Sequence, residues 1–205
     1  MPDSKDESHE ISLAVWDLPS PLIFGDRARV KVGVKCSAGC SLNGQTIAIQ
    51  TENSVKNGGT LGSTPWPGTA ALYWSELEFD VPPATGKWSW KILLLPAASD
   101  QTHREASSPL PITIVAPPEH RLAVTVLDRS LKLPIADADI RLGPHKGATN
   151  SDGLAQLDLP KGMYELTAWK HGYKASESSI EIKADSVVHV ELEPDPEPEP
   201  EYWMG

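Results

Sequence analysis

The stretch "RVKVGVKC" at residues 29–36 decides the fold class of this chain. Every second side chain is apolar, and the positions between them are charged or carry no side chain. One face of the segment therefore favours burial while the other tolerates water, which predicts an antiparallel β-strand over a core. The apolar positions are Val30, Val32, Val34 and Cys36, and the alternating ones are Arg29, Lys31, Gly33 and Lys35.

The same period of two recurs on both sides of this stretch. It is seen at 11–15, and further strand candidates are 46–51, 73–81, 87–95 and 110–115. No segment shows a sustained helical period, and the connectors are rich in Gly, Pro, Asn and Ser. Residues 10–116 are therefore predicted to form a β-sandwich of immunoglobulin or fibronectin-III type. The likeness is architectural only, because the Cys-Trp-Cys spacing of antibody-type domains is absent.

A domain boundary is predicted at "APPEH", residues 116–120. Two adjacent prolines cannot donate to a sheet and stiffen the chain, so residues 117–120 are interpreted as a linker. A second all-β domain follows at 121–193. Its segments "LAVTVLD", "PIADADIRLG", "LPKGMYELTAWKHGY", "SIEIK" and "VVHVELEP" succeed one another as strands and turns. The "NSDG" at 150–153 is a turn by its chemistry, since Asn and Asp bond their own backbone and Gly153 accepts a positive φ.

Residues 120–193 resemble the carboxypeptidase regulatory-like domain, a small transthyretin-like β-sandwich. The resemblance rests on a "P-[IV]-x-[GD]-A-x-[IV]" segment, a "T-x-[SD]-D-G" turn, "L-P-x-G-x-Y-x-L" and a final "G-Y". The matching residues are Pro134, Ile135, Ala138, Ile140, Thr149, Asp152, Gly153, Leu159, Pro160, Gly162, Tyr164, Leu166, Gly172 and Tyr173. The resemblance implies a fold and a non-catalytic folding, binding or adhesion unit that accompanies another module.

The net charge of −10 is concentrated at the two ends. Residues 1–10 hold four acids and one base, and residues 193–205 hold five acids and no base, while the two domains are nearly neutral. Segments 1–9 and 194–205 are therefore expected to be disordered acidic termini. Acidic ends repel phosphate and no basic stripe is present, so nucleic acid is excluded as the expected partner.

The opening "MPDSKDESHE" has neither a basic nor an apolar region typical of a signal peptide. The apolar run "ILLLP" is too short to cross a bilayer, so no membrane span is expected. These features predict a soluble cytoplasmic protein. The alternative is an exported protein whose signal peptide has been removed.

The two cysteines, Cys36 and Cys40, are expected to bind no metal. A metal site needs about four ligands, and no histidine or second cysteine pair lies near them in the sequence. The C-x-x-x-C spacing also differs from the two-residue spacing of thioredoxin-type redox motifs. Two alternatives stay open: free thiols in a reducing compartment, or a small-loop disulfide in an exported protein.

The seven tryptophans raise the question of an aromatic ligand platform. Trp88 and Trp90 share a face with Ile92 and Leu94 and are predicted to be core, as are Tyr164 and Leu166 in the second domain. Trp74 falls on the polar side of its strand, and Trp66 lies in the "TPWPGT" loop. These two are the candidate ligand-binding residues, with carbohydrate as the ligand, although a Pro-Trp-Pro loop also plugs the end of many sandwiches.

No catalytic residue, metal or cofactor is predicted. The six histidines are scattered, and the chain lacks H-E-x-x-H, G-x-S-x-G, P-loop and G-x-G-x-x-G motifs. Turn chemistry accounts for "NSDG" without calcium. The chain is therefore expected not to be an enzyme.

The C-terminal "PEPEPEYWMG" at 196–205 suggests a function. Alternating proline and glutamate predict an extended spacer, beyond which Tyr202, Trp203 and Met204 are suited to anchoring in a pocket of another protein. The alternatives are a tail that folds back on its own sandwich and an unselected end. The sequence thus favours a non-catalytic accessory or adaptor protein with a C-terminal docking motif. A cell-surface or envelope carbohydrate-binding module is the second hypothesis.

Overall fold

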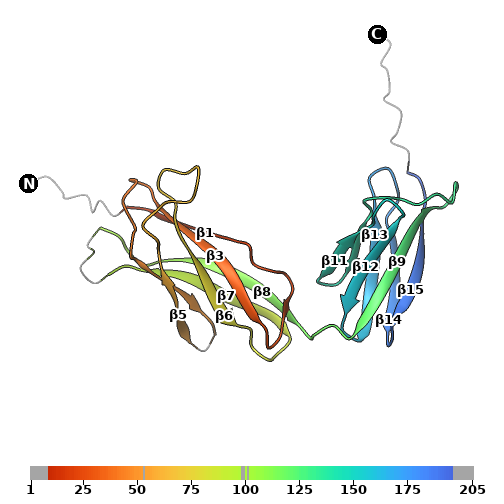
Figure 1. The fold of residues 1–205 in the computed structure, drawn as a ribbon, viewed down its shortest axis with the longest axis horizontal. Coiled ribbons are helices and arrows are strands. Elements are labelled where there is room, and N and C mark those ends of the chain that lie inside the picture. The colour runs from red at the N-terminus through yellow and green to blue at the C-terminus, as the bar shows by residue number, and fades with distance from the viewer. Residues whose placement is uncertain (1–8, 53, 98–99, 101, 196–205) are drawn as a thin grey trace, which may run out of the picture. The chain divides into compact units, whose positions relative to one another are not determined.

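A computed structural model describes residues 9–52, 54–97, 100 and 102–195 of the chain, shown in Figure 1. The described residues form strands and loops without an α-helix. Contacts divide the chain into two compact units, Met1–Val115 and Ala116–Gly205. Each unit is a β-sandwich, so the predicted all-β fold with two tandem sandwiches is confirmed. None of the described residues belongs to a helix with the length and apolar character of a membrane span.

The first sandwich consists of a three-stranded and a five-stranded sheet. The smaller sheet has the order β1 (Ile11–Trp16), β3 (Arg27–Cys36) and β6 (Tyr73–Asp80). The larger sheet has the order β2 (Leu22–Ile23), β8 (Ala106–Val115), β7 (Gly86–Leu95), β4 (Thr46–Gln50) and β5 (Val55–Thr60). Strands β2 and β5 were not predicted, because two residues show no period and "VKNGGT" lacks apolar alternation.

The core of the first sandwich forms between the alternating apolar faces of its two sheets. Val30, Val32 and Val34 of β3 are fully buried, as the alternation predicts, and they share one cluster with Ile47 and Ile92 of the opposite sheet. Trp90 is 3% exposed, in line with its predicted core position. Trp88 has the same orientation but lies nearer the strand end, where it is only partly buried against the core.

The second sandwich consists of a four-stranded and a three-stranded sheet. The larger sheet has the order β11 (His145–Ala148), β10 (Asp139–Leu142), β13 (Gly162–Trp169) and β14 (Ser176–Ile182). The smaller sheet has the order β12 (Leu154–Leu159), β9 (His120–Asp128) and β15 (Ser186–Leu192). Leu166 is buried as predicted, and Tyr164 is partly buried with its hydroxyl donating to the Pro160 carbonyl at 2.8 Å.

Two strand pairings are parallel, β15 with β9 and β2 with β8, whereas the other pairings are antiparallel. The sequence pattern could not distinguish them, because side chains alternate between faces with the same period in both arrangements. In the second sandwich this means that the last strand, β15, completes the smaller sheet beside β9.

The predicted turn at 150–153 is confirmed. The Asn150 side-chain oxygen accepts hydrogen bonds from the backbone N–H groups of Asp152 and Leu154, both at 3.0 Å. Gly153 has a φ of 70°, and a β-carbon there would lie 2.7 Å from the Val126 carbonyl oxygen. Glycine is therefore required for both its backbone conformation and the close approach of β9.

The second sandwich includes the first two residues of the segment predicted to be a disordered tail. Pro194 forms a bridge with Tyr173, and the Asp195 N–H donates to the Gly172 carbonyl at 2.9 Å. His9 likewise contacts the first sandwich, although residues 1–9 were expected to be disordered. The remaining predictions for the two ends concern residues 1–8 and 196–205, which lie outside the described residues.

Candidate functional site

The outer face of the β11-β10-β13-β14 sheet presents an exposed tryptophan above charged side chains. On β13, Leu166 and Ala168 face the core, so Thr167 and Trp169 project from the opposite face. The strand register places Asp139 of β10 directly across from Trp169, and Arg141 across from Thr167. Trp169 remains 47% exposed, an unusual position for a large aromatic side chain.

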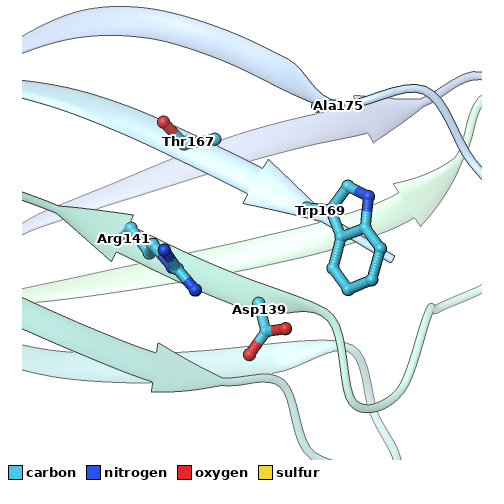
Figure 2. Close-up of a pocket in the computed structure, with 5 residues that line it drawn as sticks. All are labelled: Asp139, Arg141, Thr167, Trp169 and Ala175. Carbon is cyan, nitrogen blue, oxygen red and sulfur yellow. The ribbon is translucent and has the colours of Figure 1, made fainter. Parts of the chain in front are cut away.

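These residues line a shallow pocket of about 320 Å³ together with Ala175, shown in Figure 2. The indole ring of Trp169 forms one wall, and the carboxylate of Asp139 lies on the neighbouring strand. The pocket thus combines an aromatic face, one negative charge, one positive charge and the Thr167 hydroxyl. It can hold a single ring or side chain that has both apolar and polar edges.

Trp169 was not among the sequence-predicted site residues, although a signal for it was present. The prediction that Tyr164 and Leu166 are core also places Trp169 on the solvent face, because strand side chains alternate. What the sequence could not show is that β10 would place Asp139 and Arg141 beside it, since strand register depends on the complete sheet.

The sequence-predicted ligand residues Trp66 and Trp74 lie next to each other in the first sandwich, and both are half-buried. Their ring centroids are 4.9 Å apart with an interplanar angle of 85°, and Trp16 contacts Trp66 edge-to-face at 5.0 Å. The Nζ of Lys31 lies 5.5 Å from the Trp66 ring centroid. The three tryptophans therefore pack on one another rather than forming a flat platform, the arrangement expected of a loop that covers a sheet face.

Gly33 makes room for this tryptophan stack. It pairs with Trp74 across β3 and β6, and a β-carbon at Gly33 would lie 2.9 Å from the ring of Trp16. Any larger residue would push the Trp16 ring away from the sheet. The glycine in the alternating stretch 29–36 thus has a packing role that the alternation itself did not reveal.

A cluster of two thiols and two imidazoles lies in the first sandwich. Cys36 is the last residue of β3, Cys40 lies in the loop after it, His9 precedes β1, and His103 lies in the connection between β7 and β8. One ligand atom from each residue lies within 4.8 Å of all the others. The His9 Nδ1 is 3.1 Å from the Cys40 Sγ, and the two imidazole centroids are 5.7 Å apart.

Asp100 fixes the orientation of the His103 ring. Its Oδ2 lies 2.7 Å from the His103 Nδ1, and the Gln45 side-chain amide donates to the same oxygen at 2.7 Å. The His103 Nε2 is buried and, apart from the interaction of the ring with the Cys36 thiol, has no hydrogen-bond partner. Because Asp100 occupies Nδ1, Nε2 is the nitrogen that remains available to a ligand in the cluster.

The electrostatics of the cluster favour a thiolate at Cys36. Burial by itself raises the pKa of this thiol. Hydrogen bonds from the backbone N–H groups of Cys40 and Ala38, together with side-chain hydrogen bonds with His103 and Cys40, outweigh burial and lower the pKa to about 6. The Cys40 thiol has a raised pKa, because it forms a hydrogen bond with Cys36 and because it is partly buried. The hydrogen bond with His103 lowers the pKa of Asp100 to about 2, which keeps its carboxylate charged.

The distance of every histidine from Cys36 and Cys40 in the sequence does not carry over to the structure. Folding brings His9 and His103 to the two cysteines from separate segments. No spacing motif indicates this, because the four residues come from three parts of the chain. Both cysteines are free thiols in the structure. The other sequence-predicted site residues, Tyr202, Trp203 and Met204, lie outside the described residues.

The chain matches no protein-family model and no curated protein. Among solved structures, the Bacillus anthracis TIE protein is similar over 95% of this chain at 13% identity and a TM-score of 0.31, and this chain spans 42% of its length. The CARDB domain of PF1109 from Pyrococcus furiosus covers 53% of this chain at 12% identity and a TM-score of 0.37, with 97% of that domain matched.

The D312A variant of BcpA, the major pilin subunit of Bacillus cereus, is similar over 89% of this chain at 10% identity and a TM-score of 0.31, and this chain spans 70% of its length. Such values identify neither a family nor an activity for this chain. The resemblance of residues 120–193 to the carboxypeptidase regulatory-like domain is not confirmed by these comparisons and stays a prediction. The expectation of a cytoplasmic location likewise gains no support from them.

Proposed function

We propose that this chain is a non-catalytic accessory protein that binds a partner protein through the outer face of its second sandwich. The observation that carries the proposal is the exposed Trp169 next to Arg141 and Asp139 on paired strands. Tryptophan and arginine are the residue types that contribute most to protein–protein binding energy. An exposed indole also loses contact with water when a partner covers it, which favours association.

The site is rigid enough to bind without large rearrangement. Strands β10 and β13 are the two central strands of their sheet, so each is hydrogen-bonded to a neighbour on both sides. Side chains on such strands keep a fixed spacing, which lowers the entropy lost on binding. The pocket volume of about 320 Å³ suits one large side chain of a partner.

The second sandwich also exposes more large apolar side chains than the first. Met163 is 65% exposed and lies on the same face of β13 as Trp169, because both positions have the same parity. The described large apolar side chains that are exposed in this unit are Leu131, Leu133, Met163, Trp169 and Val187. In the first sandwich the corresponding residue is Val55. Of these, Met163 and Trp169 share the outer face of β13, so this face rather than the side of Val187 is favoured as the binding surface.

The C-terminal motif Tyr202–Met204 is a second docking element in this proposal. It rests on the sequence: an acidic, proline-rich spacer separates the motif from the sandwich and gives it reach. A docking surface and a tethered motif on one chain would bind two sites of a partner, and the tether raises the effective concentration of the second contact.

Carbohydrate is the second candidate ligand, and the pocket chemistry favours it specifically. The Trp169 ring can stack on the apolar face of a sugar while Asp139 accepts and Arg141 donates hydrogen bonds to neighbouring hydroxyl groups. This would place the carbohydrate site on the second sandwich rather than at Trp66 and Trp74. A surface or envelope location would accompany such a function.

The test uses the full-length protein as bait in an extract of its host, compared with Trp169→Ala and with a form lacking residues 196–205. Val187→Ala, which removes an exposed apolar side chain from the other sheet, is the matched control. The proposal expects a stable protein partner that Trp169→Ala weakens at least tenfold and Val187→Ala leaves unchanged.

The same four proteins are then applied to a panel of neutral and acidic oligosaccharides. Binding that depends on Trp169 there, with no protein partner, selects the carbohydrate function instead. If neither assay responds to Trp169→Ala, the outer sheet face is not a binding site and the proposal fails.

A further inference from the structure

The thiol–imidazole cluster of the first sandwich has the donor set of a metal site. Two sulfurs and two ring nitrogens lie within 4.8 Å of one another. In a tetrahedral zinc site, bond lengths of about 2.3 Å to sulfur and about 2.0 Å to nitrogen put the donors about 3.3–3.8 Å apart. The cluster is close to that size, and the 3.1 Å separation of His9 Nδ1 and Cys40 Sγ shows that side chains from distant segments already converge.

The His103 ring shows that the cluster is prepared for a ligand. Apart from the interaction of the ring with the Cys36 thiol, its Nε2 is buried without a hydrogen-bond partner, which destabilises a protein unless a ligand binds there. Its other nitrogen lies 2.7 Å from the Asp100 carboxylate. A carboxylate that orients a histidine whose second nitrogen binds metal is the usual outer-shell arrangement of zinc proteins.

We propose that His9, Cys36, Cys40 and His103 bind one zinc ion in the first sandwich. Two thiolates and two imidazoles in a compact group favour zinc, whereas magnesium and calcium prefer oxygen ligands. All four coordination positions are supplied by the protein, and Cys36 is 0% exposed. A site without an open position binds no substrate, so the ion has a structural role.

The ion would fasten the two sheets of the first sandwich together. Cys36 ends β3 of the three-stranded sheet, and His103 lies between β7 and β8 of the five-stranded sheet. His9 adds the segment before β1. A single ion thus links three segments that are far apart in the sequence, as a disulfide would in an oxidising compartment.

The experiment starts from the full-length protein, stripped with a chelator, kept reduced and titrated with Zn²⁺ and, separately, with Co²⁺. The proposal expects one Zn²⁺ per chain and, with Co²⁺, the absorption of a tetrahedral cobalt–thiolate complex. His189→Ala, an exposed histidine of β15, is the control and should bind as the wild type does.

Two variants weaken the site without removing a core side chain. His9→Ala deletes a ligand outside the strands, and Asp100→Asn keeps the shape of the side chain but removes its charge. Asp100→Asn should weaken Zn²⁺ binding about 10–100-fold. His9→Ala should weaken Zn²⁺ binding more than Asp100→Asn does. Cys36→Ser should abolish the cobalt–thiolate absorption. Circular dichroism shows whether each variant remains folded.

Three outcomes would overturn the proposal. The reduced wild type could bind no Zn²⁺ at micromolar concentration. It could bind Zn²⁺ with an affinity that His9→Ala and Asp100→Asn both leave unchanged, which would place the ion elsewhere. Mass spectrometry of protein from the native host could instead find a Cys36–Cys40 disulfide, because a disulfide leaves no thiolate for the metal.

Discussion

The side-chain clusters of the first sandwich and the turns of the second differ in how far apart their residues lie in the sequence. In the first, side chains from distant segments meet: the cluster of His9, Cys36, Cys40 and His103, and the stack of three tryptophans. The second sandwich contains turns that are closed locally, by side chains that bond the backbone of residues two to four positions away. Asp128, for example, accepts hydrogen bonds from the backbone N–H groups of Ser130 and Leu131, both at 2.7 Å.

The difference shows which contacts of a fold can be predicted from a short sequence motif. A turn such as 150–153 is closed by hydrogen bonds between residues two to four positions apart, so its chemistry is visible in consecutive letters. The thiol–imidazole cluster joins three segments that whole strands separate in the sequence, so no run of consecutive residues contains it. Breaking each kind of contact should therefore destabilise one sandwich and leave the other unchanged.

Removal of zinc should have the largest effect. If the ion is present at a thousand times its dissociation constant, chelation lowers the stability of the first sandwich by about 4 kcal/mol. Hydrogen exchange of the full-length protein measures this by segment. Protection should fall in 9–16, 36–42 and 102–106 and stay unchanged in 120–192. A similar loss in both sandwiches would mean that the chelator does not act at the cluster.

Thr149→Val should destabilise the second sandwich strongly. The buried Thr149 hydroxyl donates to the Ile135 carbonyl at 2.6 Å and accepts from the Ala138 N–H at 2.8 Å. Valine leaves both backbone groups buried without this partner, at a cost of about 2–4 kcal/mol. Urea unfolding measures the loss. Thr125→Val on β9 is the control, and an equally small effect of both changes would contradict the bridging role.

Trp66→Ala should destabilise the first sandwich less. It removes two edge-to-face contacts, each contributing about 0.5–1.5 kcal/mol beyond burial, so we expect the loss of these contacts alone to cost about 1–3 kcal/mol. Thermal unfolding measures it, and Trp66→Phe should recover part of the loss. Unchanged stability together with lost sugar binding would instead support the sequence-based prediction that Trp66 and Trp74 bind a ligand.

The smallest expected effect is the loss of stability of the second sandwich in acid that results from protonation of Asp128. Hydrogen bonds from the backbone N–H of Leu131, and more weakly from that of Ser130 and the Tyr173 hydroxyl, outweigh burial and lower the pKa of Asp128 below its ordinary value of 3.8. Because the folded state favours the carboxylate, this contribution is present above pH 3.8 and is lost as the pH falls through the lowered pKa.

Asp128→Asn, which carries no charge at any pH, should flatten this acid dependence. Urea midpoints of the second sandwich at pH 3 and pH 6 should therefore differ less in the variant than in the wild type. Asp152→Asn, in the exposed turn, is the matched control and should keep the wild-type difference. If both variants show the same slope, Asp128 does not contribute to acid sensitivity.

Much of the fold could be predicted from the sequence, because apolar residues at every second position indicate which side chains of a strand face the core. The positions of β1, β3, β4, β6 and β7 and the burial of Trp90 and Leu166 follow from it. Strand partners do not, since alternation is the same whatever strand lies alongside. The parallel pairing of β15 with β9 was therefore decided only in the folded sheet.

For the candidate sites, the sequence determined which face of a strand each residue occupies, and the tertiary structure decided what lies beside it. Trp169 could be placed on the solvent face of its strand from the alternation of its neighbours. Its pairing with Asp139, and the meeting of His9 and His103 with the two cysteines, required the complete sandwiches. The physical reason is that side-chain direction is a local property of the backbone, whereas proximity between distant segments depends on the packing of the whole domain.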